Sequence, residues 1–150
     1  MVERAFAVRL VIPDNEAYTA LVTMQRLGIP CERVARATVH VFGLDEEATG
    51  DELEGLVPTI ATIFNPNKHR LHVLAAPRPA HGEVWITPRE IPKPRDEVIL
   101  GGVRLPGVRT AWQATAWRLQ DAAGADVAAE VLDRAVETLL CNPAFQRAIK

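Results

Sequence analysis

The chain has 150 residues, of which 48% are hydrophobic and 24% are charged. This size and composition suffice for a buried core, and they favour one domain or two small ones. A formal net charge of -2 gives no general attraction to nucleic acid or to an anionic membrane. No apolar stretch approaches the length of a membrane span, and the alternating N-terminus is not typical of a signal peptide. We therefore expect a cytoplasmic protein that binds neither nucleic acid nor a membrane.

The first half of the chain predicts the order strand, helix, strand, helix, strand. Alternating apolar residues predict a half-buried first strand, and Asp14 or Asn15 would start the first helix, with Gly28 as its stop. In the second helix Pro58 should cause a kink or confine the regular part. The five elements are expected at residues 5–12, 14–28, 34–44, 49–64 and 69–76. The apolar stripes of the two helices are Ala17, Leu21, Met24 and Leu27, and then Leu53, Leu56, Val57, Ile60 and Ile63.

A segment rich in proline and alanine, "APRPAHGE" at residues 76–83, has no periodicity and is typical of a linker. The second half then predicts the same order of elements. They are expected at residues 83–88, 94–107 (a weaker helix), 109–119, 126–140 and 144–149. We therefore predict a first repeat at 1–76, a linker at 77–83 and a second repeat at 84–150.

The segment "LLCNPAFQRAI" near the C-terminus repeats features of "TIFNPNKHRLHV" at residues 62–73. A shift of 77 residues gives six identities across residues 37–73, where about two or three would arise from composition alone. These identities are Ala37, Thr38, Ala48, Asn65, Pro66 and Arg70 with Ala114, Thr115, Ala125, Asn142, Pro143 and Arg147. The helical stripes match better at a shift of 76, which pairs Leu56, Ile60 and Ile63 with Leu132, Val136 and Leu139. One residue must therefore be inserted before the second Asn-Pro.

Each Asn-Pro pair is predicted to end a helix and reverse the chain into a strand. Asn tolerates the conformations that end helices and precede proline, and Pro cannot continue a helix. Asn65-Pro66 and Asn142-Pro143 are therefore assigned a structural role at corresponding joints.

The second half contains the segments "VWITPREIPKPRDEVILGGVRLPG" and "AAEVLDRAVETLLCNPAFQRAI", the latter with Leu139-Leu140-Cys141-Asn142-Pro143. These segments resemble the small PurS subunit of phosphoribosylformylglycinamidine synthase, an enzyme of de novo purine biosynthesis, and the five residues match the family's closing motif. At the opening loop Lys93-Pro94-Arg95-Asp96 stands where Asp-Pro-Gln-Gly is typical. The first half keeps Phe64-Asn65-Pro66 and the following strand but lacks that loop motif.

The resemblance implies an α+β fold of two PurS-like, ferredoxin-like β-α-β-α-β repeats. These would form an internal pseudo-dimer with joined antiparallel sheets and helices on one side. The family's subunit is not catalytic and bridges the synthetase (PurL-type) and glutaminase (PurQ-type) subunits. The resemblance therefore implies a bridging subunit with these two partners, with further homo-oligomerisation also open.

Charged side chains near the second half's opening loop give a candidate docking edge for an acidic partner, the alternative being a solvated face. The residues assigned to it are Arg89, Lys93, Pro94 and Arg95. An acidic run, including Glu46, Glu47 and Asp51, is typical of a solvated helix start. Trp85, Trp112 and Trp117 lie on predicted strands, where sheet packing is the default and an interface anchor the alternative.

The search for catalytic or metal-binding chemistry predicts no catalytic residue, no metal site and no cofactor. Cys31 and Cys141 lack metal-like spacing and are expected to be reduced. His69 and His72 point to opposite faces of a predicted strand, so they make a poor metal pair. Two other function classes stay open. One is a small-molecule-binding regulatory domain with an inter-repeat pocket, and the other is an enzyme that uses His40 or Cys31.

Overall fold

A computed structural model describes residues 2–46 and 49–150, so Met1, Glu47 of the acidic run and Ala48 of the repeat alignment lie outside the described residues. The protein is α+β, as predicted. Its helical elements are α1 (Asn15–Arg26), α2 (Thr49–Leu56), a 3₁₀ turn η1 (Val57–Thr59), α3 (Ala129–Ala135) and a π-helical turn η2 (Val136–Leu140). Its strands are β1 (Val2–Leu10), β2 (Arg33–Leu44), β3 (His69–Val73), β4 (Glu83–Pro88), β5 (Ile99–Leu100), β6 (Val103–Arg104), β7 (Val108–Gln120) and β8 (Gln146–Ile149). No helix in the described ranges is both long and apolar enough to cross a membrane.

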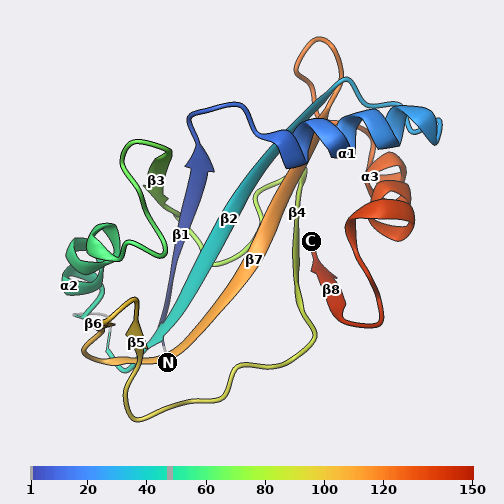
Figure 1. Cartoon of the computed structure of the whole chain (residues 1–150). Coiled ribbons are helices and arrows are strands. Elements are labelled where there is room, and N and C mark those ends of the chain that lie inside the picture. The colour runs from blue at the N-terminus through green and yellow to red at the C-terminus, as the bar shows by residue number, and fades with distance from the viewer. Residues whose placement is uncertain (1, 47–48) are drawn as a thin grey trace. The chain divides into compact units, whose positions relative to one another are not determined.

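The chain folds into two compact units, each built from both halves of the sequence. Unit 1 comprises residues 1–12, 38–77 and 90–113, and unit 2 comprises residues 13–37, 78–89 and 114–150. The long strands β2 and β7 each contribute to both units (Figure 1). Six strands form one sheet in the order β3-β1-β2-β7-β4-β8, and β5 and β6 form a separate two-stranded sheet.

Unit 1 is organised around β1, which pairs antiparallel with β2 on one side and with β3 on the other. Phe6 and Val8 of β1 pack into a core with Phe42 of β2, and the rings of Phe6 and Phe42 meet edge to face at 5.8 Å. The apolar stripe predicted for residues 49–64 completes this core with Leu53 of α2, Val57 of η1, and Ile60 and Ile63, which follow η1. Four of the five residues predicted for this stripe are therefore buried in one place, and the fifth, Leu56, packs against the same core.

Proline ends the regular part of the second helix, as predicted. The α-helix stops at Leu56, and Pro58 lies in the 3₁₀ turn that follows. A proline has no backbone N–H to donate and its ring clashes with the preceding turn, so it is tolerated at a helix start and not in the interior.

The first strand is more deeply buried than its alternating pattern predicted. Ala5 and Ala7, which alternate with Phe6 and Val8, are also buried, so the central part of β1 is covered on both faces. Ile12, which was assigned to this strand, lies beyond its end and is 48% exposed. The prediction of a half-buried strand was wrong here because alanine is small enough to be covered on the second face.

The weaker helix predicted for residues 94–107 is a β-hairpin. Ile99 pairs with Arg104 and Leu100 with Val103, and the connecting residues Gly101 and Gly102 have φ values of 54° and 78°. Positive φ at both central residues is the requirement of the type I′ turn, which fits the right-handed twist of the flanking strands. The Gly-Gly pair between β-branched and apolar residues was the sequence signal for this hairpin.

Unit 2 is organised around β4, which pairs antiparallel with β7 and β8. Val84 and Ile86 of β4 face a core that also receives side chains from α1, α3 and η2. The contributing helical residues are Ala20, Met24, Leu132, Ala135, Val136 and Leu140. In α1 the predicted stripe is confirmed at Ala17 and Met24, whereas Leu27 is exposed.

The two ends of α1 follow the sequence signals. The Asp14 side chain accepts hydrogen bonds from the backbone N–H groups of Glu16 and Ala17, so Asp14 is the N-cap. At the other end Gly28 has φ 74°, its N–H donates to Gln25, and the Ile29 N–H donates to Met24, which is the Schellman motif.

Asp14 also holds Arg36, which donates to both of its carboxylate oxygens at 3.0 and 3.1 Å. Burial acts to raise the pKa of Asp14, but the hydrogen bonds from Arg36 and from the helix start outweigh it and leave that pKa below 3.8. The guanidinium of Arg36 also lies 6.0 Å from the ring of Trp117. The start of α1 is thus joined to β2 and β7 within unit 2.

Candidate functional site

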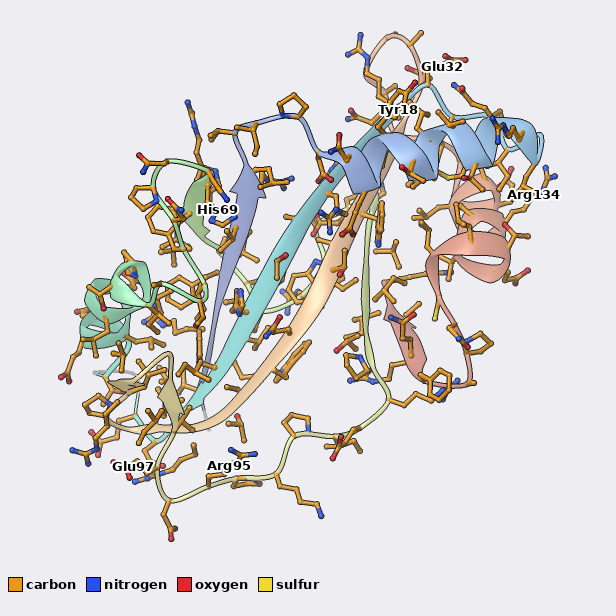
Figure 2. All side chains as sticks on the ribbon, in the orientation of Figure 1. Tyr18, Glu32, His69, Arg95, Glu97 and Arg134 are labelled. Atoms are coloured by element: carbon orange, nitrogen blue, oxygen red, sulfur yellow. The ribbon has the colours of Figure 1, made fainter. Side chains whose placement is uncertain are left out.

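The Asn-Pro turn of unit 1 lies between η1 and β3. The pair Asn65-Pro66 leads into a strand as predicted, but it does not end a helix, because η1 already ends at Thr59 after the interruption by Pro58. The Asn65 carbonyl accepts from the N–H groups of Lys68 and His69, and its side-chain Oδ1 accepts from the Asn67 N–H at 2.9 Å. The Asn65 N–H donates to Nδ1 of His69 at 3.0 Å. His69 lies on β3 beside this turn (Figure 2), and its ring packs near that of Phe64. The bond to Asn65 therefore requires Nδ1 of His69 to be the unprotonated nitrogen.

The Asn-Pro turn of unit 2 lies between η2 and β8 and repeats these contacts one for one. The Asn142 carbonyl accepts from the N–H groups of Phe145 and Gln146, and its Oδ1 accepts from the Ala144 N–H at 3.1 Å. The Asn142 N–H donates to Oε1 of Gln146 at 2.9 Å. Gln146 thus takes the place of His69, four residues after each Asn.

The strand registers of the two units coincide as well. In unit 1 Val8 of β1 lies opposite Thr38 of β2 and Leu71 of β3. In unit 2 Ile86 of β4 lies opposite Thr115 of β7 and Ala148 of β8. From unit 1 to unit 2 the residue numbers rise by 78 on the central strand and by 77 on both neighbouring strands. The numbers of the Asn-Pro pairs also rise by 77. The backbone bond from Val11 to Lys68 has a counterpart in the bond from Arg89 to Phe145 at the same shifts.

The inserted residue predicted before the second Asn-Pro coincides with the π-helical turn η2. There the Cys141 N–H donates to the Val136 carbonyl, five residues back, which adds one residue relative to an α-helical turn. Leu139, predicted to correspond to Ile63, is 37% exposed, whereas Leu140 is 9% exposed and packs in the core. The equivalent of Ile63 is therefore Leu140, because the extra residue comes before it.

The four residues predicted for partner docking fall into different units. Arg89 belongs to unit 2, where its Nε donates to the Pro143 carbonyl at 2.5 Å and so supports the second Asn-Pro turn. Lys93, Pro94 and Arg95 belong to unit 1 and have exposed side chains on the segment that leads to β5. Figure 2 labels Arg95 on this segment, and its backbone N–H donates to Arg109. All four residues are exposed, and among them Arg89 also makes a side-chain hydrogen bond within unit 2.

Arg109 holds this segment to β7. Its guanidinium donates to Oδ2 of Asp45 at 2.8 Å and to the Asp96 carbonyl. The hydrogen bond to Asp45 is the main cause that raises the pKa of Arg109 above its ordinary value. Sequence reasoning missed this contact because Arg109 and Asp45 are 64 residues apart.

His40 lies on β2 directly opposite Phe6 and is 6% exposed. Burial lowers its pKa from 6.5 to about 4, so the imidazole is neutral at pH 7. At the equivalent position of unit 2, Trp117 lies opposite Val84. His40 thus occupies a buried packing position in the sheet.

Cys31 is buried in unit 2. Its thiol donates to the Arg33 carbonyl at 3.2 Å, and burial is the main cause that raises its pKa above 9.0. A raised pKa leaves little thiolate at neutral pH, so this thiol is poorly suited to nucleophilic attack. Cys141 is also a free cysteine and is half-buried.

Trp85 is fully buried on β4, and its indole N–H donates to Oε1 of Glu83 at 2.6 Å. Packing in the sheet, the default expectation, is confirmed for this tryptophan.

Arg9 on β1 was not among the candidate site residues predicted from the sequence. Arg9 lies directly opposite Arg70 of β3, the arginine that follows the first Asn-Pro. In unit 2 the corresponding arginine, Arg147, lies opposite Thr87. Both arginines of the pair are visible in the sequence, but only the register of β1 and β3 brings them together.

No group of three or more histidine, cysteine and acidic side chains within residues 2–46 and 49–150 could hold a metal ion. In comparisons with known proteins, no family model matches the chain and no curated protein matches it.

Proposed function

We propose that this chain is a tandem PurS-like protein, whose two repeats are joined as an internal pseudo-dimer and whose second repeat has the hairpin β5–β6 in place of its first helix. The observation that carries this proposal is the repeated geometry of the two units. The four hydrogen bonds of each Asn-Pro turn and the pairing of each central strand recur at shifts of 77 and 78. Unrelated segments would have no reason to share the turn and both registers together.

The function of this protein, in our proposal, is to bridge the synthetase and glutaminase subunits of phosphoribosylformylglycinamidine synthase without catalysing the reaction itself. The support is the resemblance of the closing motif Leu139-Leu140-Cys141-Asn142-Pro143 to that of PurS, together with the geometry of that motif. Its two leucines end the π turn η2, Asn142-Pro143 begins the turn that follows, and the chain then enters β8, an outer strand of the sheet. A repeated joint of this kind supports a dimer-like chain made of two PurS-like copies.

The partner surface in this proposal includes Lys93, Pro94 and Arg95. Their side chains are exposed, and Lys93 and Arg95 form no ion pair with any described residue, which leaves both charges available to an acidic partner. The backbone bond from Arg95 to Arg109 holds this segment against β7. A segment fixed in this way would lose little conformational freedom on binding.

The test is a reconstitution with the synthetase and glutaminase subunits of the same organism. Glutamine-dependent amidation of formylglycinamide ribonucleotide is measured with and without the chain, and complex formation is followed by sedimentation. We expect amidation to require the chain. Amidation that proceeds equally well without it, or with another small subunit alone, would refute the bridging function.

Charge reversal separates docking from folding. The double variant Lys93→Glu, Arg95→Glu is expected to weaken the complex, whereas Arg26→Glu, on the exposed surface of α1, should leave it unchanged. Equal loss in both variants would contradict docking at this segment.

A further inference from the structure

Three nitrogen-bearing side chains share one face of the sheet where β1 pairs with β3. Arg9 lies opposite Arg70, and Ala7 lies opposite His72, so Arg9, Arg70 and His72 are direct or diagonal neighbours on that face. Directly opposite residues of an antiparallel pair have Cβ atoms roughly 4.5–5.5 Å apart. The two guanidinium groups can therefore reach a common point above the sheet. We call Arg9, Arg70 and His72 the basic cluster.

The positive charge of the basic cluster is not neutralised by the protein. Apart from the backbone pairing of β1 and β3, no hydrogen bond or ion pair joins the side chain of Arg9, Arg70 or His72 to another described residue. Arg9 is half-buried, and Arg70 and His72 are exposed. Like charges directly opposite each other destabilise a sheet, so this arrangement costs stability unless an anion joins it. Other arginines of unit 1 show the usual solution, since Arg4 pairs with Glu54 and Arg109 with Asp45.

The corresponding position of unit 2 lacks this arrangement. There Thr87 lies opposite Arg147, and Ile149 stands in the place of His72. The second copy thus keeps the arginine after the Asn-Pro turn but has neither the opposing arginine nor the imidazole. The position in unit 1 therefore has one guanidinium and one imidazole group that the corresponding position in unit 2 lacks.

We propose that the basic cluster is a binding site for the phosphate group of a small phosphate monoester. A phosphate offers three acceptor oxygens, two arginine forks can each donate two hydrogen bonds to it, and the imidazole supplies a further N–H donor. An acidic strand of a partner protein fits less well. Such a strand would add beside β3 at the sheet edge and would reach Arg70, whereas Arg9 rises from the second strand of the sheet.

This site does not depend on the bridging function, because its test needs no other subunit. Chemical shifts of the ¹⁵N-labelled full chain are followed during titration with ribose 5-phosphate and with inorganic phosphate at constant ionic strength. Uncharged ribose is the ligand control. We expect saturable shifts at the amides of β1 and β3, with much smaller changes at β4 and β8.

Substitutions in the basic cluster can be compared with a matched substitution at the corresponding position of unit 2. Arg70→Ala and Arg9→Thr, the latter taken from the equivalent position of unit 2, should each weaken binding of ribose 5-phosphate by about tenfold or more. Arg147→Ala, the equivalent of Arg70→Ala in unit 2, should leave the affinity unchanged. Thermal unfolding of each variant without ligand shows whether the fold is kept, and all three substitutions remove side chains without a described partner.

Three results would overturn the site. The first is a set of shifts that never saturates, and the second is an equal loss of affinity in Arg147→Ala and Arg70→Ala. The third separates a free phosphate from a lipid headgroup: capture by phosphatidylcholine vesicles that contain phosphatidate, with no binding of ribose 5-phosphate, would assign the cluster to a membrane surface instead.

Discussion

Unit 1 and unit 2 share strand registers and turn geometry, but different elements fill their cores. In unit 2 the helix α1 packs beside α3, whereas in unit 1 the hairpin β5–β6 contributes Leu100 and Val103 beside the α2 stripe. The helix α1 follows β1, the central strand of unit 1, along the chain, but it belongs to unit 2. The hairpin β5–β6 follows β4, the central strand of unit 2, but it belongs to unit 1. The comparison shows that a shared joint and register can be kept while the crossover element changes from helix to hairpin.

The largest expected effect tests whether the core of unit 1 is as tightly packed as its burial implies. Phe42→Ala, at a residue 1% exposed that meets Phe6 edge to face, should lower the free energy of unfolding by about 3–5 kcal/mol. Phe145→Ala is the control in unit 2, because Phe145 is 72% exposed and its removal should cost less than about 0.5 kcal/mol. Urea denaturation followed by circular dichroism measures both, and similar losses would contradict the assignment of the core.

The second test uses the difference between His40 in unit 1 and Trp117 in unit 2. Because the folded-state pKa of His40 is about 4 and the unfolded value is 6.5, the unfolded chain binds a proton first as the pH falls. Stability from this residue is therefore complete above pH 6.5 and falls between pH 6.5 and 4, by about 3 kcal/mol in total. In His40→Leu this part of the pH dependence should disappear. Denaturation at a series of pH values checks it, and an unchanged profile in the variant would show that His40 is not buried as a neutral group.

A third test compares two glycines, one in each unit. Gly28→Ala should lower stability by about 1–2 kcal/mol, because Gly28 has φ 74° in the Schellman motif that ends α1. Gly55→Ala, within α2 where an added Cβ would meet no atom within 4 Å, should instead raise stability by about 0.5–1 kcal/mol. Thermal unfolding of the two variants should shift in opposite directions. Shifts of the same sign would contradict the helix assignment of one of them.

The smallest effect tests the repeat itself. Asn65→Ala and Asn142→Ala each remove the side-chain oxygen that accepts from the N–H two residues later, at a cost of about 1 kcal/mol. Because the two turns make the same contacts, the two losses of unfolding free energy should agree within about 0.5 kcal/mol. Urea denaturation measures this agreement. A loss confined to one turn would show that the shared geometry does not carry a shared energetic role.

Several features were predictable because they depend on residues close together in the sequence. Gly28 was identified as the end of α1 and Asp14 as one of two candidates for its start, Pro58 as the limit of α2, and the two Asn-Pro pairs as turns that lead into a strand. The comparison of shifts 76 and 77 even predicted one inserted residue, which coincides with the π turn η2. The sequence did not predict that Leu140, rather than Leu139, corresponds to Ile63. A difference of one residue between two apolar stripes shows that a residue is inserted, but it does not show at which position.

The hairpin β5–β6 was missed because apolar periodicity over a short segment is ambiguous between helix and strand. There the turn chemistry of Gly101-Gly102 was the better guide. Burial of Ala5 and Ala7 was missed for a different reason, since an alanine does not indicate by itself whether a second layer covers it.

The sequence by itself determined the order of most elements, the ends of α1, the limit of α2 at Pro58 and the positions of the two Asn-Pro turns. These features arise from hydrogen bonds and φ preferences among residues up to five apart, so they can be read from a short window. Only the tertiary structure decided that α1 contributes to unit 2, that β5 and β6 contribute to unit 1, and that Arg9 faces Arg70. Those outcomes depend on burial and strand register between segments distant along the chain, and the free energy that selects them is shared among many contacts.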